Sequence, residues 1–156
     1  MAEMVIGVDP DSDKHGVAIY LDGALVDLKM MSLVELRCWV AERVGIKSSL
    51  FSIENVLAQN FVYGRNTRNS KAAHAKVALS VGRCQQAQTE LMRELDHMGI
   101  KYVLHKPSGR NWAKNKALFE QRTGWDKKSN VDTRSAAYFG WLALQKGARH
   151  VGTNRR

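Results

Sequence analysis

Cysteine and proline are scarce in this sequence of 156 residues, which contains 2 of each. Cys38 and Cys84 stand alone, without the C-x-x-C or Cys/His spacing of a zinc site, so we expect neither structural zinc nor a disulfide framework. Internal repeats and low-complexity runs are missing, and 44% of the residues are hydrophobic, which argues against a disordered chain. The length suits a single domain, which we place at residues 1–150, followed by a basic C-terminal tail at residues 151–156.

Long apolar runs are also missing from the sequence. No segment approaches the roughly 18 to 20 uncharged apolar residues of a membrane-spanning helix. The N-terminus lacks a basic region followed by an apolar stretch and a cleavage site. We therefore expect a cytoplasmic protein with no membrane partner.

Acidic side chains are outnumbered by basic ones, and the imbalance is uneven along the chain. The net charge of +9 combines residues 1–60, with 5 basic and 9 acidic side chains, and residues 61–156, with 19 basic and 6 acidic ones. An acidic first part and a strongly basic second part indicate carboxylates gathered at one site beside a cationic surface that suits a polyanion.

The order of the predicted elements indicates a mixed α/β sheet with helices on both faces. Apolar residues on both alternating faces of residues 4–9 predict a central strand, and the D-G signal at residues 22–23 predicts a hairpin between two further strands. The remaining predicted elements are a helix at 32–44, a strand at 50–56, a long helix from about Val77 to Met98, a strand at 100–105, a basic helical connection at 107–122 and a helix from about Asn130 to Lys146.

Two carboxylates end predicted interior strands. Asp9 closes an apolar strand, and Glu54 shares a strand face with Ser52, opposite Phe51 and Ile53. An isolated buried carboxylate costs several kcal/mol, and a divalent cation would compensate two of them. Ligands gather beyond the carboxyl ends of parallel strands, which is where we expect both residues to lie.

A third carboxylate, Asp132, begins the face of the last predicted helix that carries Ala136 and Phe139 toward the core. We expect it to point at the sheet near the same site. Hard oxygen ligands without a His/Cys set suit Mg²⁺ or Mn²⁺ better than zinc, and two such ions roughly 3.5 to 4 Å apart can activate a water for phosphodiester hydrolysis. Other roles stay open: Asp9 could cap a turn, Glu54 could pair with a lysine, and Asp132 could stabilise the helix N-terminus.

Basic side chains alternate with aromatic ones in residues 61–71 and 106–116. Aromatic rings can stack on unpaired bases while arginine and lysine hold phosphates, so we predict nucleic-acid contacts here, with a solvated loop as the alternative for the first segment. The candidate residues are Phe61, Tyr63, Arg65, Arg68, Lys71, Lys106, Arg110, Lys114 and Lys116. On the predicted helix, Arg110 and Lys114 share one face. Trp112 fits an anchoring role better than base stacking.

Together, these segments resemble RuvC-type Holliday junction resolvases, of the ribonuclease H-like superfamily. IGVDPDSDKHGVAIY resembles the first hairpin of that family, and FSIENV its second acidic strand. NSKAAHAKVALSVGRCQQAQTELMRELDHMGIKYVLHKPSGRNWAK resembles its long helix, the following strand and a Pro-led basic segment, and NVDTRSAAYFGWLAL its last acidic helix. The resemblance implies a ribonuclease H-like five-stranded sheet, with three antiparallel meander strands and two parallel strands.

The resemblance also implies a function. It indicates a homodimeric endonuclease that uses two Mg²⁺ ions per active site, with Mn²⁺ as an option, to nick two strands of a four-way DNA junction symmetrically. Asp9, Glu54 and Asp132 fall on metal-ligand positions of the family. The fourth acidic position of the family, three residues after the third, holds Ser135 here, which leaves a serine hydroxyl, water or Asp126 to complete the coordination.

Three alternatives stay open from the sequence. A nuclease of the same fold could act on structured RNA or an RNA/DNA hybrid. A module whose site is crippled by Ser135 could bind junctions without cutting them. An actin-like nucleotide-binding fragment also begins with an aspartate-bearing hairpin, although 156 residues leave little room for its two lobes.

Overall fold

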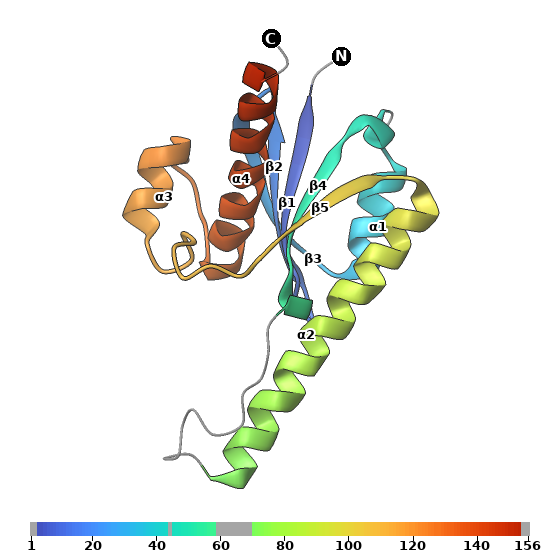
Figure 1. Cartoon of the computed structure of the whole chain (residues 1–156), viewed down its shortest axis with the longest axis vertical. Helices are drawn as coiled ribbons and strands as arrows, with labels where there is room; N and C mark the ends of the chain where they lie inside the picture. The colour runs from blue at the N-terminus through green and yellow to red at the C-terminus, as the bar shows by residue number, and fades with distance from the viewer. Residues whose placement is uncertain (1–2, 44, 59–69, 154–156) are drawn as a thin grey trace.

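A five-stranded mixed sheet forms the centre of the computed structural model, which describes residues 3–43, 45–58 and 70–153 (Figure 1). The strands are β1 (Met4–Asp9), β2 (His15–Leu21), β3 (Ala24–Met31), β4 (Leu50–Glu54) and β5 (Lys101–His105). Their spatial order is β3-β2-β1-β4-β5. β1, β2 and β3 pair antiparallel, whereas β4 runs parallel to both β1 and β5, so the predicted sheet is confirmed.

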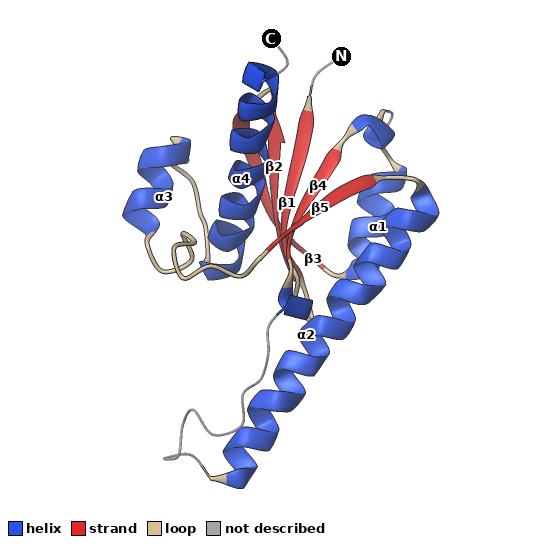
Figure 2. Cartoon of the chain, viewed as in Figure 1, coloured by secondary structure: helices blue, strands red, loops and turns tan. Residues whose placement is uncertain are grey.

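Helices cover both faces of this sheet, as Figure 2 shows. They are α1 (Leu33–Ala41), α2 (Lys71–Met98), α3 (Lys116–Thr123) and α4 (Val131–Thr153), together with short 3-10 helices at Ile46–Ser48 and Val56–Ala58. α1 and α2 pack on one face of the sheet. α4 lies across β1, β2 and β4 on the other face, with α3 beside it. No helix within the described part of the chain has both the length and the apolar character needed to cross a membrane.

Local capping explains why the predicted start of α1 and the predicted end of α2 agree with the structure to within one residue, whereas α2 begins at Lys71, six residues before the predicted Val77. Ser32 Oγ accepts a hydrogen bond from the Glu35 N–H, and the Glu35 side chain accepts one from the Ser32 N–H, which completes a capping box at the start of α1. Gly99 ends α2 with φ of 69°, a left-handed conformation that glycine adopts without a Cβ clash.

The prediction of a helix over residues 107–122 was wrong for its first part. Residues 107–115 form turns, because side chains there bond to nearby backbone N–H groups and compete with helix formation. Ser108 Oγ accepts from the Arg110 N–H, and Asn111 Oδ1 accepts from the Ala113 N–H. Asn115 then caps α3 by accepting from the Leu118 N–H.

The last helix is longer than predicted. α4 continues to Thr153, beyond the expected end at Lys146 and into the first part of the predicted tail. No proline interrupts residues 147–153, and each of the two glycines there lowers helix stability by only about 1 kcal/mol. The division into a domain at 1–150 and a tail at 151–156 stays a prediction.

Two apolar layers form the core, one on each face of the sheet. The layer beneath α1 and α2 includes Ile6, Val8, Phe51, Ile53, Leu36, Leu91 and Leu95. The layer beneath α4 includes Val5, Ala18, Tyr20, Ala136 and Ala137. The predicted alternation along β4 is confirmed, since Phe51 and Ile53 belong to the α1/α2 layer, whereas Ser52 bonds to α4.

Glycines bring α4 into backbone contact with β1 and β2. A Cβ on Gly7 would overlap the carbonyl oxygen of Ala136, and a Cβ on Gly16 would overlap the carbonyl oxygen of Asp132. Tyr20 Oη donates to the Ala137 carbonyl at 2.6 Å and ties the same helix to β2. Together, these close contacts fix the first turns of α4 beside the end of β1.

Candidate functional site

Asp9 and Glu54 meet at one end of the sheet. β1 and β4 are neighbouring parallel strands, and each ends with one of these residues. Gly7 and Ser52 both face α4, and side chains two residues apart on a strand share a face, so Asp9 and Glu54 also lie on the α4 side. Their carboxyl groups lie within hydrogen-bonding reach of each other.

Electrostatics make this pair unusual. Burial, and then the charge of Glu54, raises the pKa of Asp9 far above its usual range. Burial likewise raises the pKa of Glu54, while its hydrogen bond with Asp9 works in the opposite direction. Two close, desolvated carboxylates repel each other, so the pair holds a shared proton when no cation neutralises it.

The first turns of α4 bring Ser135 and Asp132 to the same end of the sheet. Ser135 is 2% exposed, and its hydroxyl lies close enough to Asp9 to lower the pKa of that carboxyl. The Ser135 Oγ nevertheless has no partner of good hydrogen-bond geometry among the described residues. Asp132 is half-buried and raises the pKa of Asp9 through its charge.

The predicted site residues thus form an inner pair and an outer group. Asp9 and Glu54 are in contact, whereas the charge of Asp132 has the weakest of several effects on the pKa of Asp9. Within the described ranges, no three His, Cys, Asp or Glu side chains converge as a ready-made metal site. Asp126, the other candidate for a fourth ligand, is exposed, and its charge is not among those that shift the pKa of Asp9.

The inner pair fits a hard divalent cation. Two half-buried carboxylates and one orphaned hydroxyl provide oxygen ligands of the kind that Mg²⁺ and Mn²⁺ prefer. A cation would replace the shared proton and relieve the repulsion between the carboxylates. Asp9, Glu54 and Ser135 are therefore the residues able to hold it, with Asp132 adjacent.

The turn between β1 and β2 borders this site. The Asp11 N–H donates to His15 Nδ1 at 3.1 Å, and the Asp13 N–H donates to Asp11 Oδ1 at 3.0 Å, so Asp11 stabilises its own turn, as expected for a turn residue. The thiol of Cys84, on α2, faces the same turn: burial and the charges of Asp11, Asp9 and Glu54 raise its pKa.

Sequence reasoning missed the groups that hold β4 in place. Ser52 Oγ donates to the Phe139 carbonyl of α4 at 2.6 Å and lies 2.7 Å from Nε2 of His105. On the other face, Gln88 of α2 is fully buried and bonds to Asn55 and Leu57, which follow Glu54. A polar residue on an otherwise apolar helix stripe was the only signal in the sequence.

The structure describes one of the two predicted nucleic-acid segments. Lys106, Arg110, Lys114 and Lys116 are all exposed, and Lys116 lies 3.7 Å from the Glu120 carboxylate. The shared helical face predicted for Arg110 and Lys114 was wrong, because both lie in the turns before α3.

Trp112 anchors this basic loop. Its side chain is 3% exposed and packs against Phe119, Tyr138 and Trp141, with ring centroids 5.3 to 6.0 Å apart. The predicted anchoring role is confirmed.

The other predicted segment lies mostly outside the described residues. Phe61, Tyr63, Arg65 and Arg68 belong to that part of the chain. Lys71 is exposed at the first residue of α2.

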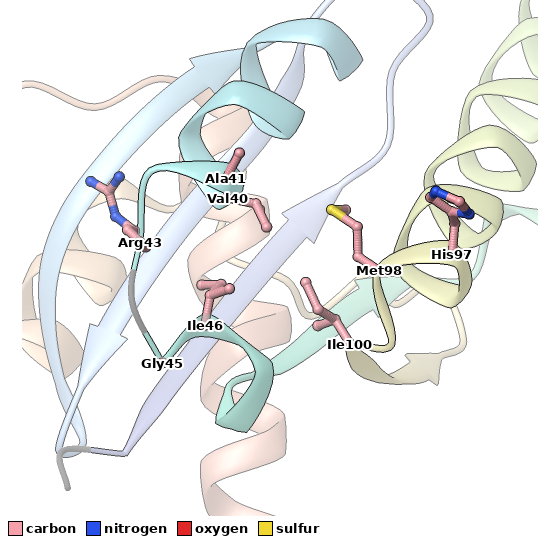
Figure 3. Close-up of a pocket in the computed structure, with 8 residues that line it drawn as sticks. All are labelled: Val40, Ala41, Arg43, Gly45, Ile46, His97, Met98 and Ile100. Atoms are coloured by element: carbon pink, nitrogen blue, oxygen red, sulfur yellow. The ribbon is translucent and has the colours of Figure 1, made fainter.

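A cavity of about 570 Å³ lies at the opposite end of the sheet, between the C-terminal ends of α1 and α2 (Figure 3). Val40, Ile46, Met98 and Ile100 make its lining mainly apolar. It contains none of the described predicted site residues, so it is separate from the carboxylate site.

Comparisons with known proteins bear on the fold. No protein-family model matches the sequence, and no curated protein matches it. Among solved structures, Thermus thermophilus RuvC aligns with a TM-score of 0.57 and 13% identity, over 94% of this chain and 96% of that chain. The T. thermophilus RuvC in complex with a Holliday junction substrate aligns with a TM-score of 0.56 and 14% identity, over the same shares of the two chains. A Fowlpox virus resolvase in complex with Holliday junction DNA aligns with a TM-score of 0.47 and 14% identity, over 91% of this chain and 99% of that chain.

The resemblance predicted from sequence motifs is therefore present in the arrangement of the whole chain. The two RuvC alignments span the five strands and the helices on both faces, at a level of identity that speaks to architecture alone. The chain has the RuvC-type, ribonuclease H-like fold.

Proposed function

We propose that this protein is a divalent-metal-dependent endonuclease that resolves four-way DNA junctions. The contact between Asp9 and Glu54 carries the proposal. The proposal is supported by two half-buried carboxylates at the carboxyl ends of adjacent parallel strands, where ligands of such sheets gather. Keeping them there without a compensating cation is costly, so the site is suited to binding one.

Each residue of the site has a separate task in this proposal. Asp9 and Glu54 hold the cation, and the Ser135 hydroxyl completes the oxygen set from α4. Asp132 adds negative charge at the margin of the site. Bound Mg²⁺, two ions per site and replaceable by Mn²⁺, would supply an activated water and stabilise the charge on the leaving oxygen. The expected products carry a 5′-phosphate and a 3′-hydroxyl.

A nucleic acid is the proposed substrate because of the surrounding charge, and the likeness of the fold to RuvC in complex with a Holliday junction substrate supports branched DNA. Lys106, Arg110 and Lys114 are exposed on a loop that Trp112 holds against α4, so their charges are available to phosphates. Two symmetric nicks need two active sites, which a homodimer provides.

One observation favours a second candidate function. Ser135 stands where the resolvase pattern has a fourth acidic residue, and no three acidic or histidine side chains converge within the described ranges. A junction-binding protein without cleavage activity would fit this reduced ligand set. Such a protein would bind four-way junctions with strong salt dependence and would leave them intact.

A cleavage assay separates these functions. Labelled four-way junction, plain duplex and RNA/DNA hybrid are each incubated with the protein in Mg²⁺, Mn²⁺ or EDTA. We expect paired symmetric nicks in the junction alone, lost in EDTA and with Asp9→Asn, and retained with Asp13→Asn as the matched control on an exposed turn residue.

The other outcomes of this assay are equally informative. Preferential cutting of the hybrid would indicate that the substrate contains RNA. Tight junction binding without cutting under any metal would establish the binding protein instead. Full-rate cutting by Asp9→Asn would exclude the proposed metal site.

A further inference from the structure

Gln88 is a polar residue at a core position where packing alone would favour an apolar side chain. It is fully buried on α2, in line with Leu91 and Leu95, which are the other residues of this helix buried in the core. A buried amide without hydrogen bonds is costly, so its partners show what the amide is for.

All the strong hydrogen bonds of this amide go to the segment that follows Glu54. Gln88 Oε1 accepts from the Leu57 N–H at 3.1 Å, and Nε2 donates to Asn55 Oδ1 at 2.9 Å. A weaker contact joins Nε2 to Met92 Sδ at 3.4 Å within α2. One side chain therefore fixes both ends of the tripeptide Asn55–Leu57.

Neighbouring bonds hold the same segment from two further directions. Gln85, one helical turn before Gln88, donates from Nε2 to the Val56 carbonyl at 3.1 Å. The Asn55 N–H donates to the His105 carbonyl at 2.7 Å, which extends the β4–β5 pairing by one residue. Asn55, Val56 and Leu57 are thus tied to α2 and β5 immediately after Glu54.

We propose that Gln88 is a positioning residue for Glu54, holding its carboxylate against Asp9 by fixing the chain that leaves β4. This inference rests on the function proposed above, because it concerns the cation that Asp9 and Glu54 would hold. Glu54 is the last residue of an edge-proximal strand, so the backbone after it determines the direction of its side chain. Without the amide, the Asn55 side chain and the Leu57 N–H lose their partners, and the segment is held only by its bonds to Gln85 and to the His105 carbonyl among the described residues.

The first test is the variant Gln88→Met, which keeps the length and apolar contacts of the side chain and removes both bonds. Gln86→Met is the matched control, since Gln86 lies on the exposed side of α2 and bonds only to Glu90 there. Circular dichroism establishes the folded fraction, and isothermal titration with Mn²⁺ alone measures metal affinity without DNA. We expect Gln88→Met to weaken Mn²⁺ binding by about 10-fold or more, the range seen when groups supporting a metal ligand are removed, with Gln86→Met near wild type.

Cleavage kinetics distinguish positioning from a general loss of structure. If Gln88 acts through Glu54, Gln88→Met cleaves the junction about 10-fold or more slowly than wild type at low Mg²⁺. At saturating Mg²⁺ its cleavage rate recovers toward that of wild type. A change confined to the folded fraction, with unchanged metal affinity per folded molecule, overturns the proposal.

Asn55→Ala covers the case in which Gln88→Met does not fold. Asn55 is only half-buried, and its loss removes the same hydrogen bond from the other side. We expect weaker Mn²⁺ binding again, and an Asn55→Ala effect that does not fully add to that of Gln88→Met, because both variants remove the bond between Gln88 and Asn55. Wild-type metal affinity in Asn55→Ala contradicts the inference.

The two proposals fail in different ways. If wild-type protein neither binds Mn²⁺ nor cuts junctions, the proposed metal-dependent function is ruled out, and the proposed role of Gln88 is ruled out with it. If wild-type protein binds Mn²⁺ and cuts junctions, but Gln88→Met has the same Mn²⁺ affinity as Gln86→Met, only the positioning role of Gln88 is ruled out.

Discussion

Gly16 of β2 lies so close to Asp132 of α4 that a Cβ on the glycine would overlap the carbonyl oxygen of the aspartate. On β1, Gly16 is paired with Asp9, so the same contact joins the end of β1, the start of β2 and the first turn of α4. The relative position of Asp132, Ser135 and Asp9 therefore depends on a glycine that carries none of the chemistry.

Replacing this glycine should disturb the site without changing any of its side chains. We expect Gly16→Ala to lower the free energy of unfolding by about 1–3 kcal/mol, because the added methyl meets backbone rather than a flexible side chain. Metal affinity should fall as well, since α4 has to move away from Asp9. Urea unfolding and Mn²⁺ titration measure the two effects.

Gly82→Ala is the matched control for that variant. A Cβ there meets no atom within 4 Å, and Gly82 lies inside α2, so the substitution should raise stability by about 0.5–1 kcal/mol through helix propensity. If Gly16→Ala is as stable as wild type, α4 does not depend on the close contact with β2.

A second prediction concerns the repulsion between Asp9 and Glu54. The folded pKa of Asp9 lies above its unfolded value, so its contribution to stability is complete below the unfolded pKa and is lost as the pH rises through the folded pKa. In EDTA above neutral pH, Asp9→Asn should therefore be the more stable protein, by about 1 kcal/mol or about 2–4 °C in Tm.

Divalent metal should reverse that order. By binding the folded state, Mg²⁺ should stabilise wild type, and it should leave Asp9→Asn nearly unchanged. Thermal melts in EDTA and in Mg²⁺, with Asp13→Asn as the exposed control, give both comparisons. A variant that is less stable than wild type in EDTA would show that the two carboxylates do not repel each other in the free protein.

The predictable parts of this molecule are those with local causes. The capping box at Ser32 and Glu35, the strand ending at Asp9 and the alternation along β4 all follow from short-range patterns. The contact between Asp9 and Glu54 could be inferred because parallel neighbouring strands end at one edge.

Other features depend on partners that are distant in sequence. Gln88 bonds to residues more than thirty positions earlier, so its place on the apolar stripe of α2 distinguishes it from the exposed Gln86 but does not indicate its partners. The turns over residues 107–115 depend on the burial of Trp112 against α4 as well as on local side-chain bonds, and helical spacing of basic residues gave no indication of either.

A third prediction concerns acid sensitivity. His15 is 2% exposed, and burial lowers its pKa, with the charge of Asp11 acting in the opposite direction. A neutral His15 accepts from the Asp11 N–H through Nδ1, and protonation removes that acceptor. Because the folded pKa is below the unfolded value, the stability from His15 is present above the unfolded pKa and is lost as pH falls from there through the folded pKa.

The variant His15→Asn tests this group, since an asparagine carbonyl can accept the same bond and cannot take a proton near neutral pH. Measured in the Asp9→Asn background, which removes the carboxylate pair, the free energy of unfolding should decline more steeply with falling pH for His15 than for Asn at this position. Parallel pH profiles for the two proteins would mean that His15 is neutral or protonated equally in both states.

The last prediction addresses Ser135, which stands where the resemblance to resolvases implies a fourth acidic residue. Ser135 is buried with its hydroxyl near Asp9 and without a partner of good geometry, so a carboxylate placed there would join Asp9 and Glu54 directly. Ser135→Asp should destabilise the protein in EDTA, because a third charge enters a desolvated pair, and should raise Mn²⁺ affinity about tenfold, equivalent to about 1.4 kcal/mol. Ser135→Asn, of the same size and without charge, is the control and should raise affinity little. Unchanged Mn²⁺ affinity in Ser135→Asp would place the cation away from α4, whereas tighter binding together with faster junction cleavage would mean that the serine limits a site whose other ligands are already in position.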